Sequence, residues 1–242
     1  MAEATPVVES FCEMIYNMTM EGDAVIGARL AERFHVAPPT VTETLKRMLR
    51  DGYIAMDARR QVTLTESGVR LAEEVLRRHR LTERFLVDML GMPWHQVHEE
   101  ATRLEHYISG AVEARVMQAL HGPTTCPHGN PIPGCVPDAR TYLRDNGAVR
   151  LLHTTPGQSA RILLVSEVVE DEEELISYLH DRGLTPGSEV TLASAPAGAS
   201  QEETVELNVA GQTVPVPARV AYALWVVPLV PIDQPASSAP VN

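Results

Sequence analysis

The sequence predicts a multidomain chain that is mainly α-helical and carries a small β domain towards its C-terminal end. Three observations support this fold class. Apolar residues recur at helical spacing through most of the chain up to His121. A proline-rich loop, "GPTTCPHGNPIPGCVP", then interrupts the helical part. From about Val149 the pattern changes to short segments of period near two, with one acidic helix among them.

The composition is that of an ordinary globular protein. With 242 residues, 44% of them hydrophobic, the chain can form one large domain or two to three small ones. No apolar run approaches the roughly 18 to 20 residues of a membrane span, and "MAEATPVVES" lacks the features of a signal peptide. Three cysteines do not make a disulfide framework. We therefore expect a cytoplasmic protein with reduced thiols.

The net charge of −12 argues against binding to nucleic acid through the whole surface, but the charge is unevenly distributed. After residue 160 the only basic residues are Arg161, Arg182 and Arg219. Residues 24 to 60 instead carry seven bases against four acids. A local basic face in the N-terminal part is therefore compatible with an acidic chain.

The first 52 residues have the spacing of a helix-turn-helix. Residues 6 to 20 form a predicted amphipathic helix. A second, short helix is predicted to begin near Asp23 and to bury Val25, Ile26, Leu30 and Phe34. After a loop at residues 35–37, Pro38 and Pro39 suit the first turn of a third helix, which Asp51-Gly52 ends.

A β-hairpin is predicted next, in "GYIAMDARRQVTLTESG", with its turn at residues 57–60. A hairpin directly after a recognition helix is typical of a wing, so arginines at its tip can meet phosphates or a minor groove. The third helix turns Val41, Leu45 and Met48 inward. Taken alone, its other face is equally compatible with a solvated helix. The candidate DNA-contacting residues are Pro39, Thr40, Thr42, Glu43, Lys46, Arg47, Arg50, Arg59 and Arg60.

Histidines and carboxylates recur at helical spacing in the next two predicted helices. The first is capped by Thr65 and reaches about Leu90, and the second runs from Pro93 to His121. His98 and Glu105 are seven positions apart, about 10 Å along a helix axis, which is too far for one shared ion. The spacing therefore predicts two metal sites, against the alternative of separate surface histidines. One would use His79, Glu83 and His98, and the other Thr102, Glu105 and His106.

A third candidate cluster lies in the proline-rich loop. Cys126, His128 and Cys135 match no strong zinc spacing, and a fourth ligand is not evident, so a reduced structural loop is favoured over a zinc site. The sequence has no HExxH motif, no nucleophile elbow and no glycine-rich phosphate loop. We therefore do not expect an enzyme.

The C-terminal part predicts a small barrel followed by a disordered tail. One acidic helix, "EDEEELISYLHDRG", lies among five short strands, which are "ARILLV", "SEVTLA", "TVELNV", "TVPVP" and "LWVVPL".

Together these segments resemble the diphtheria-toxin-repressor family of metal-dependent transcription regulators, over nearly the whole chain. The resemblance rests on "ARLAERFHVAPPTVTETLKRMLRDGYI", "LTESGVRLAEEVLRRHRLTERFL", "VHEEATRLEHYIS", "HGNPIPG" and "RGLTPGSEV". It implies a winged helix-turn-helix DNA-binding domain at residues 1–73, a helical dimerisation and metal-binding domain at 74–140, a linker at 141–148, an SH3-like (FeoA-like) domain at 149–232 and a disordered tail at 233–242.

The resemblance also implies two metal sites per protomer. The first matches the family in His79, Glu83 and His98, and the nearest matches to its two ligands from the SH3-like domain are Asp171 and Glu174.

The second site departs from the family. Glu105 and His106 match, but Ser10 and Thr102 stand where the iron-sensing branch has Met and Cys and the manganese-sensing branch has Asp and Glu. Glu13 matches a carboxylate ligand of the manganese branch and can compensate. Because the soft ligands are absent, imidazole and carboxylate remain, and we expect Mn(II) as the preferred metal with Fe(II) second.

The function that the resemblance implies is metal-activated repression of metal-homeostasis genes, by a homodimer on a near-palindromic double-stranded DNA operator. No membrane and no small organic substrate is expected as a partner. Glu43 replaces a family glutamine, so the operator sequence does not carry over. The alternative is a winged-helix regulator whose DNA binding is metal-independent and is controlled by another ligand or partner. A metallohydrolase is more remote, because no nucleophile or general base is placed beside the site.

Overall fold

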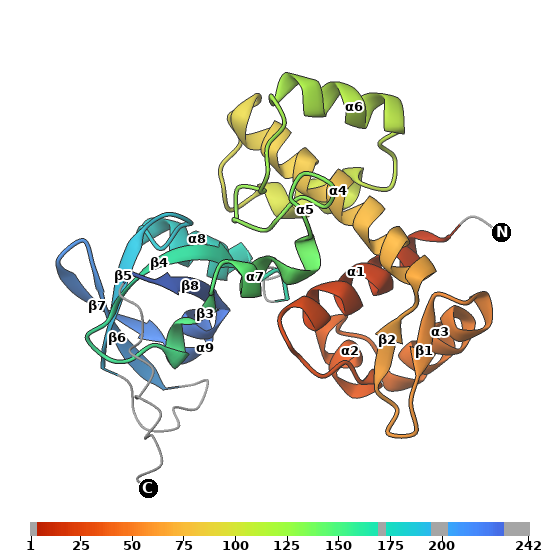
Figure 1. Ribbon diagram of the computed structural model, residues 1–242, viewed down its shortest axis with the longest axis horizontal. Helices are drawn as coiled ribbons and strands as arrows, with labels where there is room; N and C mark the ends of the chain where they lie inside the picture. Colours follow the sequence, from red (N-terminus) through yellow and green to blue (C-terminus); the bar gives the residue numbers. More distant parts are fainter. Residues whose placement is uncertain (1–3, 169–172, 195–202, 230–242) are drawn as a thin grey trace, which may run out of the picture. The chain divides into compact units, whose positions relative to one another are not determined.

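The structure is a computed structural model that describes residues 4–168, 173–194 and 203–229 (Figure 1). The chain divides into two compact units. The first comprises Met1–Leu143 with Ser166–Ser177, and the second comprises Arg144–Val165 with Tyr178–Asn242. The predicted tail at 233–242 lies outside the described residues. Among the helices that are described, none has the length and apolar character needed to cross a membrane.

The first unit begins with three helices around a short hairpin (Figure 1). They are α1 (Pro6–Met20), α2 (Gly27–Arg33) and α3 (Pro38–Asp51). Pro38 and Pro39 open α3, and Gly52 ends it in the left-handed region, with φ of 79°. The core of this part includes Ile15, Leu30 and Met48, all fully buried. The predicted helix-turn-helix is confirmed.

The predicted start of α2 near Asp23 is wrong, because the preceding residues pair with the hairpin instead. Ile26 forms an isolated antiparallel bridge with Gln61, and the Val62 N–H donates to the Val25 carbonyl at 2.9 Å. Ile26 is therefore extended and 37% exposed rather than buried in a helix. Tertiary pairing outweighs the local capping signal here.

The wing consists of β1 (Ile54–Met56) and β2 (Val62–Leu64), which are antiparallel. Its turn is held by the Asp57 carboxylate, which accepts from the backbone N–H groups of Arg59 at 2.9 Å and Gln61 at 2.8 Å. Arg60 adopts a positive φ of 60°. Arg59 and Arg60 are both exposed at the tip, so the turn presents two charges to solvent.

The helical part of the first unit consists mainly of α4 (Glu66–Asp88), α5 (Val97–Leu104) and α6 (Gly110–Ala119). Thr65 caps α4 by accepting from the Gly68 N–H at 3.2 Å, as predicted. Gly68 is required for close packing, because a Cβ there would lie 2.0 Å from the Tyr53 carbonyl oxygen.

The single helix predicted from Pro93 to His121 is wrong, because the chain breaks between α5 and α6. Ser109 is the N-cap of α6, and its hydroxyl accepts from the Val112 N–H at 3.4 Å. A Ser-Gly pair favours a cap over a helix interior, which is the physical reason for the break. This break brings Glu105 and His106 into a turn rather than into a continuous helix.

The proline-rich loop is ordered and largely buried. The Cys126 N–H donates to the Asn130 carbonyl at 2.9 Å, and the Ile132 N–H donates to the Thr124 carbonyl at 2.8 Å. Cys126, His128 and Ile132 are fully buried. The loop leads into η1 (Ala139–Thr141) and α7 (Tyr142–Asp145), at the beginning of the segment predicted as a linker.

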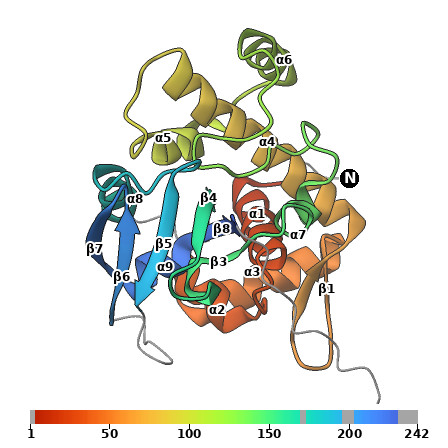
Figure 2. The same cartoon turned by 60° about the vertical axis from the view of Figure 1, so that its left-hand side comes forward.

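The second unit is built on a six-stranded antiparallel sheet in the order β3-β8-β4-β5-β6-β7, and Figure 2 shows β4, β5 and β6 side by side. This is the predicted SH3-like domain. The five predicted strands are present, and β3, η2 and α9 are additional. The elements after α7 are β3 (Val149–Arg150), η2 (Leu151–His153), β4 (Ser159–Val165), α8 (Glu173–Asp181), β5 (Glu189–Ser194), β6 (Thr204–Val209), β7 (Gln212–Pro217), α9 (Ala218–Ala223) and β8 (Leu224–Pro228).

Candidate metal centre

Helix α4 buries three ionisable side chains within five residues. His79, Arg80 and Glu83 are each no more than 1% exposed. Burial of a charge is costly unless the charge is paired or coordinated, so each of these groups must meet a partner. Arg80 has partners different from those of His79 and Glu83.

Arg80 is neutralised by Glu167. Its Nε lies 2.8 Å from Oε1 and its Nη2 lies 2.6 Å from Oε2 of that carboxylate. Asn17 of α1 joins the pair, since its amide donates to Glu167 at 2.9 Å and its oxygen accepts from Arg80 at 3.0 Å. Arg80 is thereby fully committed to protein partners and leaves the histidines and Glu83 as a separate cluster.

His79, Glu83 and His98 come together as the sequence predicted. His79 Nε2 lies 3.2 Å from Glu83 Oε1 and 3.1 Å from His98 Nδ1. His98 Nδ1 lies 3.3 Å from Glu83 Oε1. The i, i+4 spacing on α4 places the first two on one face, and α5 packs against that face to supply the third. These ligand atoms all lie within 4.8 Å of one another, as metal binding requires.

The proline-rich loop brings two further candidate ligands to Glu83. The sequence interpretation considered both of them only with Cys135, and favoured a structural loop. Cys126 and His128 extend the first group, because their ligand atoms and one of Glu83 also lie within 4.8 Å of one another, and His128 Nδ1 lies 3.2 Å from Glu83 Oε1. Trp94 fixes the loop, because its indole N–H donates to the Pro127 carbonyl at 3.0 Å. Loop spacing alone lacked a further ligand, which α4 provides from 43 positions earlier in the chain. Cys135 is not part of this group.

Glu83 provides a test of whether these residues fit a metal ion. Its Oε1 faces His79, His98 and His128 at 3.2 to 3.3 Å, while its Oε2 is buried without a hydrogen-bond partner among the described residues. A buried carboxylate oxygen with no donor costs free energy that a cation would recover. The donor set of imidazoles, carboxylate and one thiol therefore fits a divalent transition metal.

The ionisation of this cluster reflects the same crowding. Burial raises the pKa of the Glu83 carboxyl, but the charges of His128 and His79 outweigh burial and hold it well below its ordinary value. For His79, burial lowers the pKa, whereas Glu83 and the hydrogen bond to Glu105 raise it well above the ordinary value. A proton on His79 thus helps to balance Glu83 in the metal-free protein, and a metal would replace it.

A second group of ligands adjoins the first through His79. Glu13 of α1, His79 and Glu105 form a set whose ligand atoms lie within 4.8 Å, and Glu105 Oε2 is 2.6 Å from His79 Nδ1. Burial and the Glu105 charge raise the pKa of Glu13 to about 8. His79 thus lies between the two groups, because its Nε2 contacts Glu83 and its Nδ1 contacts Glu105.

The remaining predicted ligands of the second site are placed differently. The Thr102 hydroxyl donates to the His98 carbonyl at 3.0 Å, and the Ser10 hydroxyl donates to the Pro6 carbonyl at 3.0 Å, both within their own helices. His106 Nε2 lies 3.2 Å from Glu105 Oε1, while its Nδ1 lies 2.6 Å from Glu9 Oε2. Glu9, which the sequence interpretation did not single out, is thus the α1 residue that meets His106.

The structure gives no side-chain placement for the two ligands expected from the SH3-like domain. Asp171 lies outside the described residues, and Glu174 lies in α8 but its side chain is not described. Nearby in the sequence, Glu167 is described, and it binds Arg80.

The predicted DNA-contacting face is accessible. All nine of its residues are exposed except Arg47, which is half-buried. Arg47 donates to the Thr5 hydroxyl at 3.2 Å, and Lys46 pairs with Glu43 at 2.7 Å. A groove of about 600 Å³ is lined by Val7, Glu43, Thr44, Lys46, Arg47 and Arg50. Basic side chains along one face of α3 suit contact with phosphates.

Comparisons with known proteins agree with this architecture. Residues 3–62 match the N-terminal DNA-binding domain of iron-dependent repressors, residues 65–134 match their metal-binding and dimerisation domain, and residues 149–228 match the FeoA domain. Among solved structures, a manganese-dependent transcriptional repressor in complex with manganese has a TM-score of 0.78 at 30% identity, covering 92% of this chain and 100% of that one. The IdeR of T. acidophilum has a TM-score of 0.73 at 27% identity, over 94% and 100%.

Fold and site together define a winged-helix DNA-binding protein with a buried cluster of candidate metal ligands. The iron-dependent repressor IdeR of Mycobacterium leprae is 38% identical over 234 residues, 93% of this chain and 99% of that protein. The diphtheria toxin repressor of Corynebacterium jeikeium is 34% identical over 242 residues, 93% and 98% of the two chains. The chain belongs to the diphtheria-toxin-repressor family of iron-dependent repressors.

Proposed function

We propose that this protein is a metal-activated transcriptional repressor that binds operator DNA as a homodimer. The observation that carries the proposal is the environment of Glu83, whose one carboxylate oxygen faces three imidazoles and whose other is buried without a donor among the described residues. Such a carboxylate fits a cation better than any other ligand.

The metal-responsive step depends on residues from two parts of the first unit. Glu13 comes from α1, which packs on α4, and Glu105 follows α5. A bound ion would supply the positive charge that these crowded carboxylates lack. Glu13 and Glu105 would then hold α1 at a fixed angle to α4 and α5. If the arrangement that binds DNA has a higher affinity for the ion than the other arrangements, metal binding increases its population.

Mn(II) is the proposed metal, with Fe(II) second. Support comes from the carboxylates and imidazole of the Glu13, His79 and Glu105 group, which are the donors that both ions accept. Cys126 adds a soft donor beside Glu83 and favours Fe(II) or zinc in that part of the cluster. The resident ion is therefore expected to differ between the two groups.

Homodimerisation is supported by apolar side chains that the described residues leave uncovered. None of the residues of α6 is buried, and Tyr107 before it is 85% exposed. Exposed apolar residues of this helical part are Met89, Leu90, Leu104, Tyr107 and Val112. An apolar surface of this kind is typical of an association face, and a twofold dimer would present two α3 helices to a near-palindromic operator.

The test uses DNA whose sequence is not chosen in advance. Duplexes are selected from a random pool by the full-length protein with Mn(II), and binding of the enriched duplex is followed by fluorescence anisotropy. We expect binding with Mn(II), its loss after chelation, and its return when Mn(II) or Fe(II) is added anaerobically. Equal affinity in chelator and in metal would overturn the proposal.

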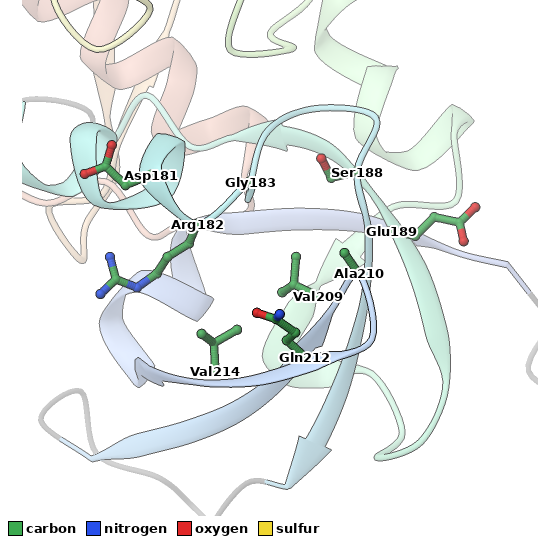
Figure 3. Close-up of a pocket in the computed structure, with 9 residues that line it drawn as sticks. All are labelled: Asp181, Arg182, Gly183, Ser188, Glu189, Val209, Ala210, Gln212 and Val214. Carbon is green, nitrogen blue, oxygen red and sulfur yellow. The ribbon is translucent and has the colours of Figure 1, made fainter.

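A second candidate function is regulation through the SH3-like domain, independent of metal. One observation favours it: a groove of about 540 Å³ lies between the end of α8, the start of β5 and the turn between β6 and β7 (Figure 3). Arg182 and Gln212 supply polar groups beside the apolar Val209 and Val214. The anisotropy experiment separates the two functions, because only this one leaves DNA binding unchanged by chelation.

A further inference from the structure

We infer that Glu9 is a positioning residue of the second metal group, acting through His106. The inference rests on the proposed metal binding and goes beyond it. Ser10 stands where the family has a metal ligand, and Glu9, the residue before it, would support the site indirectly by holding His106. It follows from which nitrogen of His106 each carboxylate meets.

The two ring nitrogens of His106 have separate partners. Nδ1 lies 2.6 Å from Glu9 Oε2, and Nε2 lies 3.2 Å from Glu105 Oε1. Both carboxylates only accept hydrogen bonds when ionised, and the contact at Nδ1 is the shorter of the two, so a single ring proton is favoured on Nδ1. The lone pair of a neutral imidazole then lies on Nε2, on the same side as Glu105. In that tautomer Nε2 can act as a ligand atom on the side of His106 where Glu105 lies.

This arrangement has the chemistry of an outer-shell carboxylate. A histidine that binds a metal commonly donates its other N–H to a carboxylate, which fixes the tautomer and the ring orientation and raises the basicity of the ligating nitrogen. Glu9 and His106 are each 14% exposed in their side chains, so solvent only partly screens their contact. The contact is therefore stronger than an ordinary surface pair.

Glu9 is also well placed along the chain. It lies one helical turn before Glu13 on α1, so the two carboxylates share a face of that helix. Glu13 faces Glu105 and His79, and Glu9 faces the outer nitrogen of His106. Ser10 lies off this face, with its hydroxyl bonded to the Pro6 carbonyl. Helix α1 of the DNA-binding part thus contacts the second group at two points, neither of which is Ser10.

The test compares the full-length protein with Glu9→Ala, Glu9→Gln and a control. The control is Glu74→Ala, which removes an exposed carboxylate of α4 outside both ligand groups. Mn(II) affinity is measured by the EPR signal of the free ion. We expect Glu9→Ala to weaken binding at the second group by about 10- to 100-fold. Glu9→Gln, whose amide oxygen still accepts from Nδ1, should retain most of the affinity, and the control should match the wild type.

A second readout uses the metal-free protein. Nitrogen-15 NMR of the imidazoles at a pH of about 8.5, above the ordinary histidine pKa, reports which nitrogen of His106 carries the proton. We expect Nδ1 to be protonated in the wild type and in Glu9→Gln, and a mixture of tautomers in Glu9→Ala. Because this readout needs no metal, it still tests the Glu9 assignment if the protein binds no Mn(II) and the proposed function fails.

Two results would overturn the inference. One is an unchanged tautomer together with unchanged Mn(II) affinity in Glu9→Ala. The other is an anomalous peak for Mn(II) in a crystal of the loaded protein that lies at about 2.2 Å from a Glu9 oxygen, which would make Glu9 a direct ligand.

Discussion

Arg80 and Glu167 form a buried, two-point ion pair, although they lie 87 positions apart in the chain. Arg80 is 0% exposed and Glu167 is 5% exposed. The pair joins α4 to the segment that follows β4, and Asn17 adds α1 to the same network. Ser166 reinforces it by donating to the carboxylate of Glu21 at 2.7 Å. A short segment of the chain is thus fixed to two helices by charge rather than by apolar contact alone.

Glu167→Ala should lower the free energy of unfolding of the metal-free protein by about 3 to 5 kcal/mol, because it leaves the Arg80 charge buried without its partner. Urea denaturation measures the effect. Glu189→Ala is the matched control, since its pair with Arg161 is 3.3 Å long but more than half exposed. We expect at most about 1 kcal/mol for that variant, and a similar loss in both variants would contradict the structure.

The metal-free protein should lose stability as the pH rises from about 5 towards 8. The raised pKa of His79 adds stability that is complete below its ordinary value of 6.5 and is lost as the pH rises through the folded value. Glu13, whose pKa is raised from 4.5 to about 8, opposes folding increasingly as the pH rises over that range. Thermal unfolding at about pH 6 and about pH 8 checks this. Glu13→Gln should flatten the dependence, and a steeper slope in that variant would count against it.

Metal binding should show the opposite trend with pH. Ligands must lose their protons to bind, so Mn(II) should raise the melting temperature more at about pH 8 than at about pH 6. The measurement is thermal unfolding with and without saturating Mn(II) at both pH values. A larger stabilisation at the lower pH would show that protonated histidines do not compete with the ion.

Cys126→Ser should reduce affinity for zinc and Fe(II) more than affinity for Mn(II), because it replaces a soft thiolate beside Glu83 and His128 by a hard hydroxyl. Competition with a chromophoric chelator gives each affinity. Cys135→Ser is the matched control, because that thiol belongs to neither ligand group. Equal losses for all three ions in Cys126→Ser would indicate a structural role for the thiol.

Arg60→Asn should weaken DNA binding by a similar factor for all sequences and reduce the slope of log affinity against log salt by about 1. Asparagine tolerates the positive φ of 60° at this turn, so the wing keeps its shape while one charge is lost. Anisotropy titrations between about 50 and 200 mM salt measure the slope. A change in base preference instead would place Arg60 at a base edge.

Much of the fold was predictable because its signals are local. Periodic apolar residues, Pro38 and Pro39 at the start of α3, and Thr65 as a cap each act within one or two turns. The break before α6 follows from a local capping signal at Ser109 that the sequence interpretation did not use. The other error occurred where distant residues decide the outcome. Ile26 leaves its predicted helix because Gln61 pairs with it, and this contact is not visible in the local pattern.

The site shows the same division. His79 and Glu83 lie one turn apart, so their meeting follows from helix geometry. Cys126 and His128 reach Glu83 only because the proline-rich loop folds back on α4, and Glu9 reaches His106 only through the packing of distant segments. The spacing of residues within one segment predicts neither of these contacts, because the residues become neighbours only once the chain has folded.

The position of His79 between Glu83 and Glu105 has a consequence for how the protein would respond to rising metal. A neutral imidazole has one lone pair, so His79 can serve as ligand towards Glu83 or towards Glu105, but not towards both. Two ions would therefore compete for this ring. An ion in one group would remove His79 from the ligands available to the other group. The two groups would therefore fill one after the other as the metal concentration rises, and not independently.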